Sequence, residues 1–269
     1  LFFGDRQVSS AGERTGLVGQ VFHSVASKYD VMNDLMSGGI HRLWKDYMVC
    51  KLRPVPGMRM IDVAGGTGDI AFRIARKLER QSLGGLGKVM VGGSTTPTDK
   101  SSEVWVTDIN PSMLGVGKDR AKAQGLDQLS SVSLEWKEVN AEEVPFPDNH
   151  FDTYTIAFGI RNVTNIPQAL REAYRVLKPG GRFLCLEFSK VVVPGLRELY
   201  ELYSDNIIPL LGQVVAQDRS SYEYLVQSIR RFPDQATFES MLRDAGFQLV
   251  TYENLTGGVV ALHSGYKLV

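Results

Sequence analysis

A glycine-rich segment follows a short apolar stretch early in the chain: Asp62-Val63-Ala64-Gly65-Gly66-Thr67-Gly68-Asp69. Glycines at such a place let the backbone pass close to a ligand, and the first amides of the following helix can donate hydrogen bonds to it. The stretch from Gly66 to Ala71 also fits the loose GxGxxA form of the dinucleotide-binding fingerprint. A tight strand-to-helix turn without a ligand is the alternative interpretation, and the loop by itself leaves both open.

Two polar residues stand where the next two predicted strands end. Asp108 follows Val104 to Thr107, and its carboxylate can accept hydrogen bonds from both hydroxyls of a ribose. Asn140 follows Val132 to Val139, where its amide can recognise an adenine edge and the backbone amide of Ala141 can add a second bond. Asp108 could instead cap the next helix, and Asn140 could form an Asx turn. Ligands of open parallel sheets bind beyond the carboxyl ends of the strands, so these positions indicate a nucleoside-containing ligand.

The elements that must position these residues alternate along the chain. The predicted strands are Met58 to Ala64, Val104 to Thr107, Val132 to Val139, Thr153 to Phe158 and Arg182 to Phe188. The predicted helices between them are Ala71 to Glu79, Pro111 to Ala123 and Pro167 to Leu177. Such alternation predicts an α/β fold with a parallel sheet and right-handed crossovers. Phe247 to Leu255 and Val259 to Leu268, separated by Gly257 and Gly258, predict a closing antiparallel hairpin.

Further segments surround this core. Helical periodicity over Leu17 to Tyr29 and Ile40 to Leu52 predicts two helices before it. Ser82 to Ser102 is rich in Gly, Ser and Thr and has no apolar period, so residues 81–103 are predicted to be a flexible surface insertion. A long helical region with several tyrosines follows Phe188, and another helix is predicted from Phe238 to Ala245.

Composition excludes several classes of protein. The 269 residues contain 30 Lys plus Arg and 30 Asp plus Glu, so no net field gathers polyanions and nucleic acid is not an expected partner. Cys50 and Cys185 lack CxxC spacing and a nearby His pair, which predicts buried thiols in a reducing compartment and no metal site. No run approaches the roughly 18 apolar residues of a membrane helix, so we expect a soluble or peripheral protein. The chain starts at Leu1, and a targeting peptide would not be visible in it.

Several longer motifs carry a resemblance to known enzymes. The glycine-rich loop, Asp108, Asn140-Ala141-Glu142 and Leu177-Lys178-Pro179-Gly180-Gly181-Arg182, in this order, resemble class I methyltransferases. Four more motifs resemble the ubiquinone and menaquinone biosynthesis C-methyltransferases: Lys28 to Asp34, Gly39 to Lys45, Phe158 to Thr164 and Leu186 to Ser189. The likeness continues through Tyr222 to Ile229 and covers almost the whole chain except the insertion.

This resemblance implies a Rossmann-like class I methyltransferase fold, with a mostly parallel seven-stranded sheet, a C-terminal antiparallel hairpin and N-terminal helices. Residues 1–52 would form a helical cover and residues 53–269 the methyltransferase domain, together one structural domain. The methyl donor would be S-adenosylmethionine, with no metal. The residues that would bind it are Thr67, Asp108, Asn140 and Ala141, in a loop shaped by Gly65, Gly66 and Gly68. Ala64 replaces the first glycine of the generic pattern, and we expect it to keep ordinary strand dihedrals.

The resemblance also implies a reaction. Family members transfer the methyl group to a ring carbon of a polyprenyl benzoquinol, or of a demethylmenaquinol. Ionising the hydroxyl beside that carbon makes it nucleophilic, which needs a proton acceptor and a partner for the phenolate. Arg161 is the expected partner, by charge or by positioning a water, and a salt bridge with a surface carboxylate is the alternative. His41, Asp30 and Tyr29 are the candidate proton acceptors.

The acceptor and the partners of the chain follow less directly. The tyrosines Tyr200, Tyr203, Tyr222 and Tyr224 would form either core or the apolar mouth for the quinol. The enlarged insertion resembles eukaryotic members, which implies mitochondria and peripheral attachment to the matrix face of the inner membrane. Expected partners are other ubiquinone-biosynthesis enzymes in a membrane-associated complex and a second copy in a homodimer.

Three other functions remain open at this point. An NAD-dependent oxidoreductase would place its ribose-binding acid about 20 residues after the glycine loop, and Asp108 lies much further along. A methyltransferase-like assembly factor would keep the fold without the chemistry. O- or N-methylation of another small acceptor would use the same cofactor site.

Overall fold

The computed structural model describes residues 2–3, 6–7, 34, 37–86, 101–211 and 219–268. Its main strands are β3 (Arg59–Val63), β4 (Ser102–Asp108), β5 (Val132–Glu138), β6 (Phe151–Ala157), β7 (Leu177–Phe188), β8 (Gln248–Leu255) and β9 (Val260–Tyr266). Two short strands, β1 (Phe2–Phe3) and β2 (Arg6–Gln7), pair only with each other.

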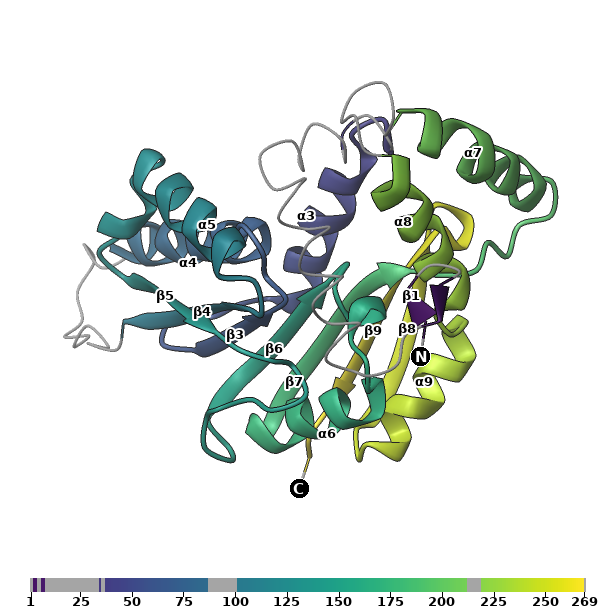
Figure 1. Ribbon diagram of the computed structural model, residues 1–269. Coiled ribbons are helices and arrows are strands. Elements are labelled where there is room, and N and C mark those ends of the chain that lie inside the picture. The colour runs from purple at the N-terminus through teal and green to yellow at the C-terminus, as the bar shows by residue number, and fades with distance from the viewer. Residues whose placement is uncertain are drawn as a thin grey trace.

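Helices cover both faces of the sheet (Figure 1). They are α3 (Ile40–Leu52), α4 (Asp69–Leu86), α5 (Pro111–Ala123), α6 (Ile166–Val176), α7 (Leu196–Leu211), α8 (Arg219–Arg231) and α9 (Gln235–Asp244). A short turn of 3-10 helix, η2 (Ile160–Asn162), follows β6. Within the described ranges, none of these helices is both long and apolar enough to cross a membrane.

The seven main strands form one sheet in the order β5-β4-β3-β6-β7-β9-β8. The first five pair in parallel, and β9 runs antiparallel to both β7 and β8. The predicted class I methyltransferase architecture, with its closing antiparallel hairpin, is therefore confirmed. The strand order reverses direction between β3 and β6, and the crevice at such a switch point is where open sheets of this kind bind ligands.

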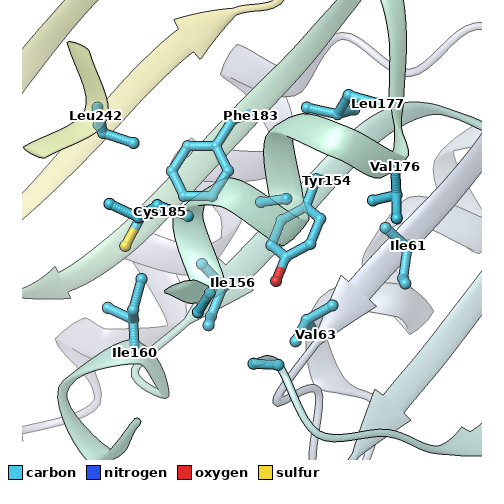
Figure 2. Packing of buried hydrophobic residues seen from close by; sticks show 14 of the residues in the cluster. Ile61, Val63, Tyr154, Ile156, Ile160, Val176, Leu177, Phe183, Cys185 and Leu242 are labelled. Atoms are coloured by element: carbon cyan, nitrogen blue, oxygen red, sulfur yellow. The ribbon is translucent and has the colours of Figure 1, made fainter. Parts of the chain in front are cut away.

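A buried core lies on each face of the sheet. On one face, Ile61, Tyr154 and Phe183 pack with Val176 of α6 and Leu242 of α9 (Figure 2). On the other face, a second cluster joins the strands to α3 and α4. Each fully buried large apolar side chain contributes about 1.5 to 3 kcal/mol. These clusters hold the strand ends in register, and the strand ends carry the site.

Helix α3 packs as part of the second core. Trp44, Met48, Val49 and Leu52 are buried against residues of α4 and the sheet, in agreement with the predicted helix over Ile40 to Leu52. The prediction of a buried thiol is wrong for Cys50, which lies on the exposed side of this helix, and confirmed for Cys185. The other predicted N-terminal helix, Leu17 to Tyr29, lies outside the described residues. The division at residue 52 between a cover and a catalytic domain stays a prediction.

The predicted boundaries of the insertion are wrong at both ends. Helix α4 continues to Leu86, because an established helix gains one hydrogen bond per added residue and tolerates a glycine at a cost of about 1 kcal/mol. At the other end, Ser102 is buried in β4 and its Oγ accepts a hydrogen bond from the Gly57 amide at 2.9 Å. The part of the insertion between them, 87–100, lies outside the described residues.

Candidate functional site

A cavity opens beyond the carboxyl ends of β3, β4, β5 and β6, with Lys45 of α3 in its wall. The predicted cofactor residues that line it are Gly65, Gly66, Thr67, Asp108, Asn140 and Ala141. The topology thus brings together residues that lie up to 76 positions apart. Three other predicted residues, Gly68, His41 and Arg161, are not among those lining it. The candidate proton acceptors Tyr29 and Asp30 lie outside the described residues.

The glycines of the loop have separate tasks. A Cβ on Gly65 would lie 2.9 Å from the Asp62 carboxylate, so the backbone passes closely over the end of β3. Gly66 has a φ of +55° and donates its amide to Asp108 Oδ2 at 2.9 Å. Gly68, with a φ of +86°, packs against Phe72 and Trp136 instead of the cavity. Gly68 therefore shapes the loop on the side that faces away from the cavity.

Ala64 does not keep strand dihedrals, contrary to expectation. Its φ is +51°, in the left-handed region, which costs a non-glycine residue about 1 to 2 kcal/mol. The chain must turn sharply here because β3 ends at Val63 and the loop turns back over it. Gly159 faces the Ala64 methyl group: a Cβ on Gly159 would lie 2.5 Å from that of Ala64. A glycine after β6 thus makes room for the alanine after β3.

Asp108 is held firmly at the end of β4. Its Oδ2 accepts the Gly66 amide and its Oδ1 accepts the Asn110 amide, each at 2.9 Å. Burial raises the pKa of Asp108, and the backbone amides around it oppose that rise. The following helix has its own N-cap, Asn110, whose side chain accepts the Ser112 amide. The helix therefore does not need the Asp108 carboxylate as its cap, and Asp108 lines the cavity.

Asn140 combines both of its interpretations. Its Oδ1 accepts the Glu142 amide at 3.0 Å, which is an Asx turn, and the residue also lines the cavity. Ala141 beside it is 8% exposed and lines the same wall. The turn fixes the backbone at the end of β5 and engages the side-chain oxygen of Asn140. The side-chain NH2 group is therefore the part that would face an adenine edge.

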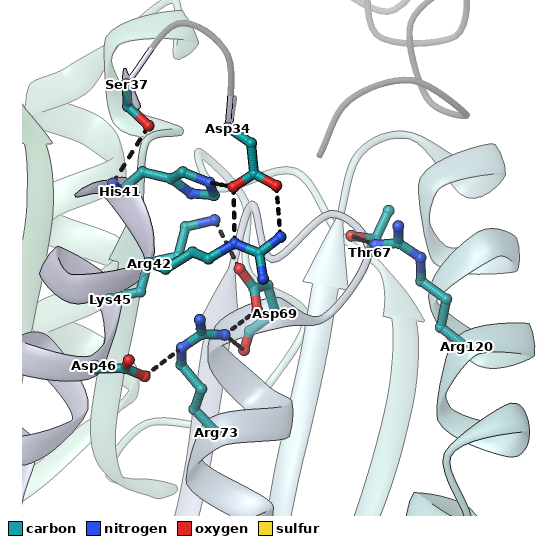
Figure 3. A network of polar contacts seen from close by, with 10 residues as sticks. All are labelled: Asp34, Ser37, His41, Arg42, Lys45, Asp46, Thr67, Asp69, Arg73 and Arg120. Atoms are coloured by element: carbon teal, nitrogen blue, oxygen red, sulfur yellow. Dashed lines mark hydrogen bonds and ion pairs between the residues drawn. The ribbon is translucent and has the colours of Figure 1, made fainter. Parts of the chain in front are cut away.

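Thr67 is tied to the helix across the loop. Its Oγ1 accepts a hydrogen bond from Arg120 of α5 at 2.9 Å, and Thr67 is 5% exposed (Figure 3). The side chain thereby joins the glycine loop to α5. A second polar link lies at the start of α4, where Lys45 Nζ donates to Asp69 Oδ2 at 2.7 Å. Arg73 also pairs with Asp69 and, at 2.8 Å, with Asp46.

Asp62 and Lys45 are among the residues that line the cavity and that sequence reasoning missed. Asp62 is 1% exposed; its Oδ1 accepts the Thr155 hydroxyl at 2.7 Å, whereas no donor among the described residues reaches Oδ2. Burial, together with the nearby carboxylates, raises the pKa of Asp62 to about 7. The sequence held a signal for both residues. Asp62 is the first residue of the glycine-loop motif, at the end of the first predicted strand, and Lys45 is the last residue of the Gly39 to Lys45 motif.

These groups fit S-adenosylmethionine. Asp62 offers an unmatched buried carboxylate oxygen to an ammonium group. Lys45, which pairs with Asp69, places a cation in the same wall for a carboxylate. Asp108 lies where ribose hydroxyls need an acceptor, and the Asn140 to Ala141 turn lies where an adenine would sit. The opposite charges of Asp62 and Lys45 match the zwitterionic amino-acid end of this cofactor, which a dinucleotide lacks.

The affinity of the cofactor should depend on pH through Asp62. Its carboxyl has a pKa of about 7 in the empty site, and an ammonium group binds only its ionised form. Below pH 7 cofactor binding must expel a proton from the Asp62 carboxyl, so S-adenosylhomocysteine affinity should fall by up to about tenfold per pH unit. Calorimetric titration over about pH 6 to 8 checks this. In Asp62→Asn the affinity should be lower and this slope absent; an equal slope in both proteins would assign the titration to another group.

Arg161 lies in a buried ion pair. Its Nη1 donates to Glu187 Oε1 at 2.8 Å and to the Phe158 carbonyl at 2.6 Å. The side chains of Arg161 and Glu187 are 4% and 1% exposed, so the expected alternative, a surface carboxylate, is not the partner. Burial raises the pKa of Glu187, whereas the guanidinium favours its charged form. Arg161 thus lies one layer behind the cavity, and its role stays a prediction.

The turn around Arg161 is nevertheless part of the site. Phe158, Gly159, Asn162, Val163 and Thr164 on both sides of it line the cavity. Tyr224 of α8 donates its hydroxyl to Asn162 Oδ1 at 3.0 Å. Tyr224, one of the four predicted tyrosines, therefore reaches the turn after β6. Burial raises the pKa of Tyr200 in α7 to about 12, and the positive charge of Arg161 opposes this rise.

His41 faces away from this cavity. Its Nε2 lies 2.8 Å from Asp34 Oδ1, and the residue lines a separate groove between α3 and α4. Burial lowers the pKa of His41, and the hydrogen bond to Asp34 partly opposes this. The placement favours a structural hydrogen bond, and proton acceptance by His41 stays a prediction.

Comparison with known proteins identifies the family. Residues 8–267 match the model of the ubiE/COQ5 methyltransferase family. The chain is 56% identical to the 2-methoxy-6-polyprenyl-1,4-benzoquinol methylase, mitochondrial, of Bos taurus, over 99% of this chain and 83% of that protein. It is 55% identical to the proteins of the same name from Oryza sativa subsp. japonica and Arabidopsis thaliana, over 99% of this chain and 88% and 90% of theirs.

Solved structures agree at the level of the fold. A SAM-dependent methyltransferase from Aquifex aeolicus aligns with a TM-score of 0.55 and 17% identity, over 88% of this chain and 97% of that one. A second, from Thermotoga maritima, aligns with a TM-score of 0.57 and 18% identity, over 92% and 99%. The family match and the named relatives set aside the dinucleotide-dependent oxidoreductase. The chain belongs to the ubiE/COQ5 methyltransferase family and is a methyltransferase whose methyl donor is S-adenosylmethionine.

Proposed function

We propose that this enzyme C-methylates 2-methoxy-6-polyprenyl-1,4-benzoquinol in ubiquinone biosynthesis. The names of its relatives, at 55 to 56% identity over 99% of the chain, support this substrate. The observation that carries the proposal is the buried Arg161–Glu187 pair directly behind the cavity. It places a fixed cation at the end of β6, where an ionised ring hydroxyl of the quinol would need one.

In the proposed reaction the ring carbon would form a bond to the methyl group while the carbon–sulfur bond breaks and S-adenosylhomocysteine leaves. A base or a water would then take the proton that this ring carbon loses. S-adenosylmethionine supplies an already electrophilic methyl group. The protein must therefore align the ring and favour its phenolate. Arg161 stabilises the phenolate charge, directly or through one water. Glu187 holds Arg161 by accepting hydrogen bonds from its guanidinium Nη1 at 2.8 Å and from its backbone amide at 3.4 Å.

Glu187 acts here as a positioning residue. Its Oε1 accepts from Arg161 Nη1 at 2.8 Å and from the Phe188 amide at 2.9 Å. Phe188 in turn lies under the guanidinium, 5.4 Å from its carbon to the ring centroid. The guanidinium is therefore held before the substrate arrives, which lowers the reorganisation needed as charge develops on the ring oxygen.

The test is turnover of a short-chain demethyl benzoquinol with S-adenosylmethionine labelled in its methyl group. Product analysis by mass spectrometry and NMR should find the label on a ring carbon. Label on a ring oxygen, as an aryl ether, would make the enzyme an O-methyltransferase. Absence of turnover in a protein that binds S-adenosylhomocysteine would instead support the assembly-factor alternative. A demethylmenaquinol tested in parallel decides between the two quinol classes.

Location and partners belong to the same proposal. The relatives are named mitochondrial, which supports a mitochondrial location for this chain. We propose peripheral attachment to the matrix face of the inner membrane, because the polyprenyl chain of the substrate resides in a bilayer. Assembly with other ubiquinone-biosynthesis enzymes is a further part of the proposal, because a complex would let a lipid substrate pass from one enzyme to the next. A homodimer is also proposed.

A further inference from the structure

A groove separate from the cofactor cavity runs along α4, with α3 on one side and α5 on the other. Its volume is about 560 Å³. Six cations line it against two carboxylates; the cations are Arg42, Arg73, Arg76, Lys77, Arg80 and Arg120. The whole chain carries equal numbers of basic and acidic side chains, so this groove concentrates positive charge locally.

Arg120 donates to Thr67, and the other five cations of the groove divide into two groups. Arg42 and Arg73 pair with carboxylates, Asp34 for the first and Asp46 and Asp69 for the second. Arg76, Lys77 and Arg80 donate to neutral acceptors: the side chain of Gln124, the Val49 carbonyl and the Arg76 carbonyl. In the part of the chain that the structure describes, no carboxylate pairs with these three, so their charge is available to an external anion.

Sequence spacing explains how the three cations gather. Positions 73, 76, 77 and 80 follow the i, i+3, i+4, i+7 pattern and therefore share one face of α4. Arg76 and Arg80 are exposed. Leu83 continues this face one turn later and is 57% exposed, and Leu43 on α3 beside Arg42 is 65% exposed. Exposed leucines beside a basic face are typical of surfaces that lie on a bilayer, where the leucine enters the headgroup boundary.

We propose that this groove docks the protein onto anionic phospholipid headgroups. Each phosphodiester carries a negative charge that can compensate the positive charges of Arg76, Lys77 and Arg80. Leu43 of α3 and Leu83 of α4, exposed on the two helices that border the groove, add apolar contact. A nucleic acid or a polyanion without apolar side chains would match the charge but would gain nothing from the two leucines. The proposal rests on the proposed function only in that a polyprenyl substrate gives the enzyme a reason to approach a membrane.

The groove is connected to the cofactor cavity by shared residues. Asp69 lines both, and Arg120, which also lines the groove, donates to Thr67 of the glycine loop at 2.9 Å. Figure 3 shows Arg120, Arg73 and Asp69 around this boundary. A bilayer bound at the groove therefore lies next to the cofactor loop.

The experiment measures flotation of the full chain with two kinds of vesicle: phosphatidylcholine alone, and phosphatidylcholine mixed with phosphatidylglycerol. The wild type should prefer the anionic vesicles, and this preference should weaken as salt screens the charges. The variant Arg76→Gln/Lys77→Gln/Arg80→Gln should lose about fivefold in partitioning per side chain, hence about a hundredfold in all. Leu83→Ser should lower partitioning more modestly at every salt concentration.

A matched control removes the same charge elsewhere. Arg171→Gln/Lys178→Gln/Arg243→Gln neutralises three cations on α6, β7 and α9, away from the groove, and should float like the wild type. Equal flotation of the groove variant and the wild type, or equal loss in the control, would overturn the proposal. Binding of an oligonucleotide or a polyglutamate through the same three residues, without vesicle binding, would also overturn it in favour of a soluble polyanion.

Turnover of the water-soluble short-chain quinol separates this inference from the proposed function. The groove variant should keep that turnover while losing the vesicles. Failure of all proteins to methylate the quinol would contradict the proposed function and leave the flotation result to decide the groove by itself.

Discussion

Arg161→Ala should lower the single-turnover rate of methyl transfer by about a hundredfold or more while leaving cofactor affinity nearly unchanged, because a cation beside the ring oxygen matters most as negative charge develops there. A free phenol ionises near pH 10, so raising the pH should restore part of the lost rate. Arg161→Lys should give an intermediate rate, since it keeps the charge but not the planar fork. Single-turnover rates measured over a pH series check all three.

The ion pair with Glu187 requires a control. Removing Arg161 alone leaves the buried Glu187 carboxylate without its partner, which costs about 3 to 5 kcal/mol of stability. The double variant Arg161→Gln/Glu187→Gln removes both charges and should fold more stably than Arg161→Ala, yet remain slow. A fast double variant would show that the single variant suffered from misfolding. Wild-type rates in Arg161→Ala would remove Arg161 from the mechanism, and lost cofactor affinity would make it a binding residue.

Asp108→Ala should weaken S-adenosylhomocysteine binding at least about tenfold, because two ribose hydroxyls lose a charged acceptor in a largely buried site. Hydrogen bonds to charged groups contribute about 1.5 to 3 kcal/mol each. The Gly66 amide also loses its partner, Asp108 Oδ2, which loosens the glycine loop. Isothermal titration calorimetry on a protein of checked fold measures the effect.

Asp119 supplies a matched control for this experiment. It lies on the exposed side of α5, so Asp119→Ala removes one carboxylate without touching the cavity and should bind like the wild type. Asp108→Asn should retain part of the affinity, since an amide oxygen still accepts one bond. Unchanged affinity in a folded Asp108→Ala protein would refute the ribose assignment.

Local sequence patterns were sufficient for most of the fold. A continuous apolar strand ending in glycines, followed by alternating helices and strands, predicts a parallel sheet. Two strand segments separated by Gly257 and Gly258 predict the antiparallel hairpin that β8 and β9 form. The same logic placed Asp108 and Asn140 at strand ends, where the cavity lies. Strand ends are readable because the ligand crevice of such a sheet always lies at their carboxyl side.

The remaining features depend on contacts between distant residues. Ala64 can adopt the left-handed backbone conformation because Gly159, 95 positions later, leaves room for its methyl group. Arg161, in the turn after β6, is held by Glu187 of β7. A single sequence does not show that these two residues form a pair. Helix α4 continues beyond the segment whose apolar residues follow helical spacing. Each residue added to an established helix gains one hydrogen bond, so the helix extends further. The partner of a buried charge and the end of a helix are thus decided by tertiary packing.

The most direct test of the central claim is a crystal structure of the enzyme with S-adenosylhomocysteine and a short-chain demethyl benzoquinol. We expect the cofactor to contact Asp62, Asp108 and the Asn140 to Ala141 turn, with a ring carbon of the quinol facing the sulfur. A ring oxygen should lie within hydrogen-bond distance of Arg161, directly or through one water. A quinol whose hydroxyl oxygen faces the sulfur, or whose ring lies away from the turn after β6, would contradict the account.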